Sequence, residues 1–150
     1  KSQSIPAFNT TTLELVSALK KRFSSLIVYS GIDAYRQEES VELDYADKKL
    51  QAGADGFFSQ PFFDIHLAES YLKRFKSCEF FVGIAPVTKQ SSYDYWVSVN
   101  KVSFPSEFQL DLAYNCNLAK RLIDLANSYN QHCYLMPIKT PVAGYLEGIF

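Results

Sequence analysis

Short runs of consecutive apolar residues alternate along the chain with stretches in which apolar residues recur every three or four positions. Runs such as SLIVYSGI (25–32) and EFFVGIAP (79–86) predict buried strands. TTLELVSALKKRF (11–23) has helical spacing and opens with the capping box Thr11-x-x-Glu14. The whole pattern predicts helices at 11–23, 40–53, 65–76, 89–100 and 112–128, strands at 25–32, 56–60, 79–86 and 132–138, and a short helix after Pro141.

Polar residues and glycines mark the ends of several predicted helices. Ser40 is expected to cap the helix at 40–53, and Gly53 to end it. Asp64 is expected to cap the helix that follows the second strand. In the first helix, the residues at helical spacing that we expect to face the core are Leu15, Leu19 and Phe23.

Strands that alternate with helices indicate βαβ units, and therefore an α/β fold with a parallel sheet and flanking helices. Two architectures agree with this order: part of a (β/α)8 TIM barrel, or a small open doubly wound sheet. A closed barrel takes about 250 residues, whereas the chain has 150 residues and four predicted strands. We therefore expect a single domain over residues 1–150 that forms part of a barrel.

The predicted second strand, GFFSQ (56–60), ends on Gln60, whose polar amide is unexpected in an otherwise apolar strand. A buried amide must find hydrogen-bond partners or destabilise the fold. In both architectures, ligands bind at the carboxyl ends of the parallel strands, which is where Gln60 lies. Gln60 is therefore either bonded to the backbone of a turn or exposed to a ligand.

Composition narrows the classes of function. A net charge of −1 gives no basic surface for nucleic acid. No apolar stretch is long enough to span a membrane, and no secretory signal is present, so we expect a cytoplasmic protein. The three cysteines are widely spaced, which is typical of reduced thiols. Because no CxxC or HExxH motif occurs, we expect no metal site.

Several segments resemble one enzyme family. KKLQAGADGFFSQPFFD (48–64) resembles the methylenetetrahydrofolate reductase pattern, in which a helix ending K-x-x-A-G-A-D leads to a strand ending T-Q-x-F-F-D. FVGIAPVT (81–88) and VSFP (102–105) are similar to the segments that follow in that family. NLAKRLIDLANSYNQHCYLMPI (117–138) has the layout of its last helix and strand, and IDAYRQEE (32–39) is a weaker match. The resemblance covers about residues 11–150 and corresponds to the second, C-terminal half of the family's barrel.

The resemblance implies an FAD-dependent oxidoreductase that uses NAD(P)H to reduce 5,10-methylenetetrahydrofolate to 5-methyltetrahydrofolate, a step that serves methionine synthesis. By position, Gln60 would bind the pterin edge of the folate substrate. Tyr35 and Lys49 would contact FAD, Lys49 near its phosphates. Glu42 and Tyr45 fall where the family has further polar contacts to the flavin. The family's proton-donating carboxylate comes from the first half of the barrel, so no catalytic residue is assigned here.

Two other interpretations remain open at this point. The chain fits a catalytically inactive, flavin-free homologue that binds folate or a partner protein, or an unrelated small α/β domain. Four parallel strands left open expose two sheet edges, which folded proteins cover. We therefore expect an upstream half-barrel or a partner chain to complete the barrel, or a homo-oligomer. The start at Lys1 rather than Met is consistent with a fragment or a processed product.

Overall fold

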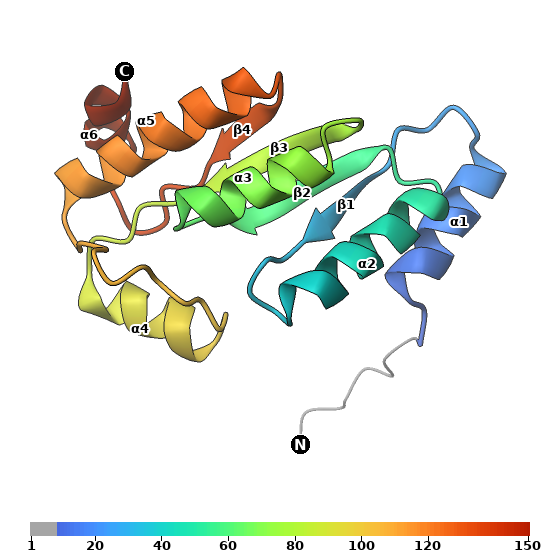
Figure 1. Ribbon diagram of the computed structural model, residues 1–150, viewed down its shortest axis with the longest axis horizontal. Helices are drawn as coiled ribbons and strands as arrows, with labels where there is room; N and C mark the ends of the chain where they lie inside the picture. Colours follow the sequence, from blue (N-terminus) through green and yellow to red (C-terminus); the bar gives the residue numbers. More distant parts are fainter. Residues whose placement is uncertain (1–8) are drawn as a thin grey trace.

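A computed structural model describes residues 9–150 of the protein, in which strands and helices alternate (Figure 1). The strands are β1 (Tyr29–Ile32), β2 (Gly56–Pro61), β3 (Glu79–Ile84) and β4 (His132–Leu135). The helices are α1 (Thr12–Arg22), α2 (Glu39–Gln51), α3 (Ile65–Arg74), α4 (Gln90–Ser98), α5 (Leu112–Ser128) and α6 (Val142–Ile149). Each predicted helix and strand is present, with ends that differ by a few residues. The predicted α/β class is confirmed.

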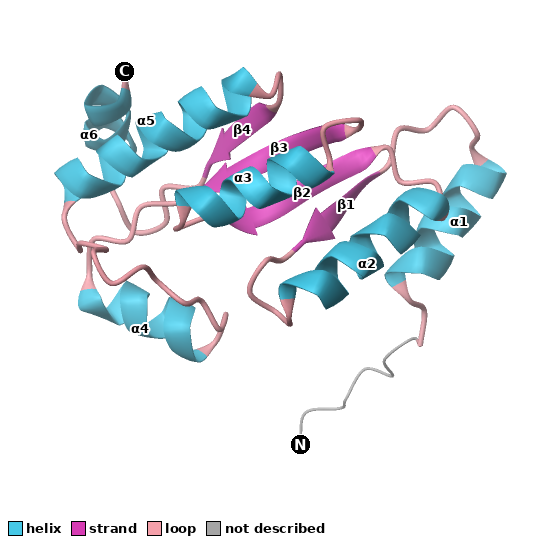
Figure 2. Cartoon of the chain, viewed as in Figure 1, coloured by secondary structure: helices cyan, strands magenta, loops and turns pink. Residues whose placement is uncertain are grey.

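The four strands form one parallel sheet in the order β1-β2-β3-β4 (Figure 2). This order follows the sequence, as in a (β/α)8 barrel. A doubly wound sheet has a point at which the strand order reverses, and the described sheet has none. The sheet is therefore an arc of the barrel type, and the doubly wound alternative does not apply. All four carboxyl ends meet at one edge because the strands are parallel.

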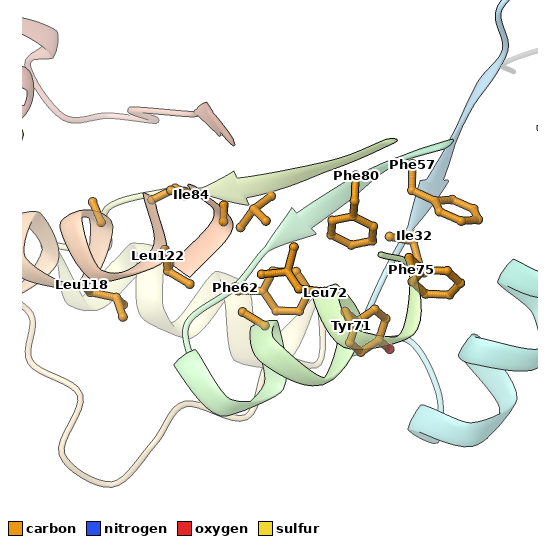
Figure 3. Close-up of a cluster of buried hydrophobic side chains, with 14 of the residues drawn as sticks. Ile32, Phe57, Phe62, Tyr71, Leu72, Phe75, Phe80, Ile84, Leu118 and Leu122 are labelled. Atoms are coloured by element: carbon orange, nitrogen blue, oxygen red, sulfur yellow. The ribbon is translucent and has the colours of Figure 1, made fainter. Parts of the chain in front are cut away.

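The main core lies between one face of the sheet and helices α2, α3, α5 and α6. Figure 3 shows the rings of Phe57 and Phe80, from β2 and β3, close to Phe75 after α3. The Phe57 and Phe75 ring centroids are 5.0 Å apart, and the Phe75 and Phe80 rings are stacked. The next layer contains Leu72 and Leu122 from the helices. The helices thus cover the outer face of the arc.

The opposite face of the sheet carries exposed and half-buried aromatic side chains. Burial alternates along β2, so Phe57 and Ser59 are buried while Phe58 and Gln60 are exposed. The Phe58 ring stacks on Phe81 with centroids 4.2 Å apart, and Tyr134 meets Phe58 edge-on at 5.4 Å. In a closed barrel this face would be the interior. We call it the inner face.

Some details of the sequence prediction were wrong. The strand predicted at 25–32 begins only at Tyr29, and Leu26 and Ile27 before it are exposed rather than buried. In α1, Val16 is the buried residue, while Leu15 and Phe23 are about half exposed. Because α1 packs beside α2 at the edge of the sheet, it buries a narrower face than a helix over the sheet centre.

The predicted helix ends were correct in three places and wrong in one. Thr11 and Glu14 form the capping box, and the Asp64 carboxylate accepts from the backbone N–H groups of His66 and Leu67. Gly53 ends α2 with a φ of 108°, which favours glycine. Ser40 is not the N-cap of α2, because the helix already begins at Glu39 and Glu38 precedes it. Within residues 9–150, no helix is long and apolar enough to cross a membrane.

Asn115 on α5 fixes the loop that follows β3. Its buried side-chain oxygen accepts from the Val87 N–H at 2.8 Å, and its Nδ2 donates to the Val87 carbonyl at 3.1 Å. The same Nδ2 also contacts the carbonyls of Gln109 and Asp111, at 3.2 and 2.7 Å. This one amide therefore joins three chain segments near the carboxyl end of β3.

We expect Asn115→Leu to lower the free energy of unfolding by about 1–3 kcal/mol, because it leaves the buried Val87 N–H without an acceptor. Urea unfolding followed by circular dichroism measures the change. Asn117→Leu, two residues further along the same helix and exposed, serves as the control and should change stability by about 0.5 kcal/mol or less. Equal losses in the two variants would contradict the role given to Asn115.

Candidate functional site

A pocket of about 460 Å³ opens beside the carboxyl-terminal halves of β1 and β2. Its lining comes from β1 and the loop after it, from α2, and from the inner face of the sheet. Four of the five residues predicted to bind ligand line it, namely Glu42, Tyr45, Lys49 and Gln60. The lining also includes Asp33, Arg36, Phe58 and Tyr134. The structure thus brings together residues from segments far apart in sequence, at the edge of the sheet where ligands of such folds bind.

The end of β2 holds Gln60 on the inner face. The register of β2 against β3 shifts between Phe58 and Pro61. The Ser59 hydroxyl accepts from the Gly83 N–H at 2.9 Å, and the Tyr134 hydroxyl donates to the Ser59 carbonyl. A Cβ on residue 83 would lie 2.8 Å from that carbonyl oxygen, so only glycine allows the two strands to approach this closely here.

Gln60 is exposed and lines the pocket. Within residues 9–150, no hydrogen bond holds this side chain to the rest of the protein. Of the two possibilities that the sequence left open, the bonded turn residue is therefore wrong for this conformation. The amide keeps one acceptor and one donor group available to a ligand.

Glu42 and Lys49 are buried within the wall of the pocket. Their side chains are 1% and 4% exposed, and Lys49 Nζ lies 3.7 Å from Glu42 Oε1. Lys49 Nζ also donates to the Gly31 carbonyl at 2.7 Å and lies 4.4 Å from the centre of the Tyr45 ring. Burial lowers the pKa of the Lys49 ammonium, and the negative charge of Glu42 opposes that effect. Both charges therefore serve the fold of β1 and α2.

The Glu42 carboxylate binds the loop that follows β1. It accepts from the Asp33 N–H at 3.2 Å, from Arg36 Nη2 at 2.9 Å and from Gln37 Nε2 at 2.7 Å. Unlike Glu42, Arg36 is open to solvent, with a side chain 52% exposed, and its guanidinium lies 5.4 Å from the centre of the Tyr45 ring. Arg36 is thus the exposed cation of the pocket lining.

Tyr35 lies apart from the other predicted residues. Its hydroxyl accepts from the Phe63 N–H at 3.0 Å, and its ring packs against the Phe63 ring. Burial is the main cause that raises the pKa of its hydroxyl. Phe63 belongs to a second apolar cluster with Trp96 and Val87. In the described conformation Tyr35 is therefore a structural link between the β1–α2 loop and the end of β2, and its predicted contact with FAD stays a prediction.

A wider hollow, of about 740 Å³, lies at the amino ends of the strands and is lined by polar residues that include Glu79 and His132. Its Gln131 side chain is already bonded to the backbone of Phe80 and Cys78. In barrel folds this end contributes to stability, whereas sites lie at the carboxyl ends. We therefore assign the site to the pocket of about 460 Å³ at the carboxyl ends of β1 and β2. The described residues contain no group of three side chains that could hold a metal ion.

Sequence reasoning missed Arg36 and Tyr134 as members of the site. Arg36 lies in IDAYRQEE (32–39), the weaker match to the family, and its position six residues before Glu42 gives no helical signal. Tyr134 reaches the pocket from β4, 75 residues away from the Ser59 carbonyl that it contacts. Only the parallel pairing of β3 with β4 brings it there.

Comparison with known protein families gives a match that covers most of the chain. The family model described as methylenetetrahydrofolate reductase matches residues 4–124, which is most of the chain. The chain belongs to the methylenetetrahydrofolate reductase family. The match includes β1, β2, β3 and the greater part of the pocket, and it ends within α5. Among curated proteins, none matches the chain.

Membership of the methylenetetrahydrofolate reductase family supports an oxidoreductase of that type, from a family that is generally flavin-dependent and forms TIM barrels. The arc of four parallel strands fits part of such a barrel. The resemblance that the motifs at 48–64 and 81–88 indicated is therefore confirmed at the level of the family and the fold.

Proposed function

We propose that the protein is an FAD-dependent methylenetetrahydrofolate reductase, or a close relative, that reduces 5,10-methylenetetrahydrofolate to 5-methyltetrahydrofolate with NAD(P)H. The observation that carries the proposal is the exposed Gln60, which lines the pocket at the carboxyl end of β2 and lies within the segment that matches the family model. We further propose a cytoplasmic location and a role in one-carbon metabolism that supports methionine synthesis.

The role of Gln60 follows from the chemistry of its amide. A pterin ring has adjacent donors and acceptors along one edge, and a carboxamide offers one of each in a fixed fork. Phe58 and Tyr134 lie beside Gln60 on the inner face and supply apolar ring surface next to it. The pocket would therefore orient the folate by two hydrogen bonds at its edge and by ring contacts along its face.

The residues around the pocket fit a flavin in part. The Tyr45 ring and the exposed Arg36 guanidinium are suited to a polar, phosphate-bearing ligand. Lys49 and Glu42 fit less well than the resemblance implies, because their charged groups already bind Gly31, Arg36 and each other. When bound, the flavin would accept a hydride from the nicotinamide and pass it to the folate. The protein's own residues would bind and orient the two ligands.

We also propose that further strands, from an upstream half-barrel or from a partner chain such as a second copy, cover the inner face. The aromatic residues of that face support this, since Phe58 is 39% exposed beside the stacked Phe81 ring. Large apolar side chains gathered on an exposed sheet face mark a surface that another element covers. A residue that donates a proton to the folate would come from those strands.

The second candidate is a flavin-free homologue that binds folate or a partner protein. The internal pairing of Glu42 with Lys49 is the observation that favours it. The visible absorption of the purified protein, before and after incubation with FAD, separates the two candidates. Flavin bands that NADH or NADPH bleaches and methylenetetrahydrofolate restores would support the reductase. Protein that stays colourless after incubation but still binds folate would support the flavin-free homologue.

We expect Gln60→Ala to weaken folate binding about tenfold or more, because both hydrogen bonds to the pterin edge are lost. Isothermal titration with a folate measures the dissociation constant. Gln51→Ala is the matched control: Gln51 is an exposed glutamine at the C-terminal end of α2 and does not line the pocket. Its substitution should leave the dissociation constant unchanged. Unchanged affinity in Gln60→Ala would count against folate binding at this pocket.

A further inference from the structure

The exposed donors of Arg36 form the one charged feature of the pocket that no internal contact explains within residues 9–150. Its side chain is 52% exposed, and Nη2 donates to Glu42 Oε2 at 2.9 Å. A guanidinium has five N–H donors in a rigid fork, and Glu42 is the side-chain partner that the structure gives it. Within residues 9–150 the remaining donors have no side-chain acceptor, and Arg36 lines the pocket that also contains Gln60.

Lys49, the cation that the family pattern points to, is not open in the same way. Its side chain is 4% exposed, and its ammonium contacts the Gly31 carbonyl, the Glu42 carboxylate and the Tyr45 ring. Contact with a ligand phosphate would require it to leave all three. Movement of the Lys49 ammonium would also leave the buried Glu42 carboxylate without this partner, which is energetically unfavourable.

Glu42 links the two cations. Its carboxylate has Lys49 near Oε1 and Arg36 and Gln37 on Oε2. The buried carboxylate therefore holds Arg36 Nη2 and leaves the other N–H groups of this half-exposed side chain available, while the Tyr45 ring lies within cation–π distance. A guanidinium held in this way loses little freedom when it binds a second oxyanion.

We propose that Arg36 is the residue that receives a phosphoryl group in this pocket, and that Glu42 and Lys49 act as positioning residues behind it. The inference depends on the proposed function in one respect only, namely that the phosphoryl group belongs to a dinucleotide cofactor. A pair of phosphoryl oxygens matches the fork of the Arg36 guanidinium, which lines the pocket.

The charges around Arg36 indicate modest affinity for an isolated anion. Glu42 and Lys49 neutralise each other, which leaves Arg36 and the Asp33 carboxylate on the same loop. One oxygen of Asp33 accepts from the Tyr35 N–H at 3.0 Å, which holds it within its own turn. Binding should therefore weaken with rising salt, as for other partly exposed charges.

The test is a titration of the purified protein with inorganic pyrophosphate. Arg36→Gln should raise its dissociation constant about tenfold or more, and Arg36→Lys should restore part of the affinity because it keeps the charge but not the fork. Arg74→Gln is the matched control: its side chain is 50% exposed and pairs with one carboxylate, that of Asp47, away from the pocket. A loss in Arg74→Gln equal to that in Arg36→Gln would overturn the proposal.

The positioning role needs a double-mutant cycle. Lys49→Met should weaken pyrophosphate binding in the wild-type background and add little in the Arg36→Gln background, because Lys49 acts through Arg36. Additive losses, or a larger loss in Lys49→Met than in Arg36→Gln, would assign the phosphate contact to Lys49 instead. Circular dichroism checks that each variant is folded. If Lys49→Met does not fold, the Arg36 variants still test the main claim, because the Arg36 side chain is half exposed.

Titrations with riboflavin, FAD and NAD⁺ identify the source of the phosphoryl group. If Arg36→Gln lowers the affinity for FAD but not for riboflavin, the proposal is supported and the phosphoryl group is that of the flavin dinucleotide. If it lowers the affinity for NAD⁺, the proposal is supported and the phosphoryl group is that of the nicotinamide dinucleotide. If neither cofactor binds while pyrophosphate still depends on Arg36, the proposed function fails and the inference stands. If both cofactors bind and Arg36→Gln changes neither affinity, the inference fails and the proposed function stands.

Discussion

Glu42→Ala is expected to lower the free energy of unfolding by about 3–5 kcal/mol, the range for removing one partner of a buried ion pair. The side chain of Glu42 is 1% exposed and that of Lys49 is 4% exposed. Without the carboxylate, the Lys49 ammonium stays buried with the Gly31 carbonyl as its polar partner, and Arg36 and Gln37 lose their acceptor. The β1–α2 loop should therefore loosen together with the end of β1.

Chemical denaturation of three variants measures this effect. Glu38→Ala, an exposed carboxylate just before α2, is the control and should change stability by about 0.5 kcal/mol or less. Glu42→Ala combined with Lys49→Met should be less destabilised than Glu42→Ala alone, because no unpaired charge remains in the wall of the pocket. A loss below about 1 kcal/mol in Glu42→Ala would mean that the carboxylate is not buried as described.

Phe57→Ala is expected to destabilise the protein by about 3–5 kcal/mol, as large-to-small substitutions of buried aromatic residues do. Phe57 is fully buried, with ring centroids 5.0 Å from Phe75 and 6.3 Å from Phe80. Removing the ring leaves a cavity where β2 and β3 pack against α3. The free energy of unfolding in urea measures the loss, and a value below about 1 kcal/mol would contradict the described core.

Phe58→Ala is the matched control for Phe57→Ala, because it removes the same ring from the next residue on the other face of β2. Phe58 is 39% exposed in the described chain, so its truncation should cost about 1 kcal/mol, largely the stacking on Phe81. In a closed barrel Phe58 would be buried as well. The ratio of the two losses therefore also reports whether further strands cover the inner face.

The fold was largely predictable because its elements have strong local signals. The capping box at Thr11 and Glu14 and the N-cap Asp64 need only neighbours in sequence, so the corresponding helix starts were correct. Leu26 and Ile27 have the same apolar character as buried strand residues, but they precede the point at which β1 pairs with β2. Their exposure depends on this pairing and on the position of α1, neither of which the residue pattern contains.

The site was predictable only as far as the family motif reached. Gln60 follows from its place at the carboxyl end of a parallel strand, and the structure places it in the pocket. The resemblance implies a ligand contact for Tyr35, which stays a prediction. The hydroxyl of Tyr35 accepts from the Phe63 N–H, a contact across 28 residues that depends on the loop conformation. The sequence pattern does not indicate a role for Arg36, because its pairing with the buried Glu42 depends on how the loop folds back over α2.

The central claim is that the Gln60 amide binds the pterin edge of a folate. The most direct test is a nuclear magnetic resonance titration of isotopically labelled protein with a folate, read at the side-chain amide of Gln60. We predict that its N–H₂ resonances shift with saturation and show nuclear Overhauser contacts to the bound pterin. Folate binding that leaves these resonances unchanged, and instead perturbs His132 and Glu79 at the amino ends of the strands, would contradict the account.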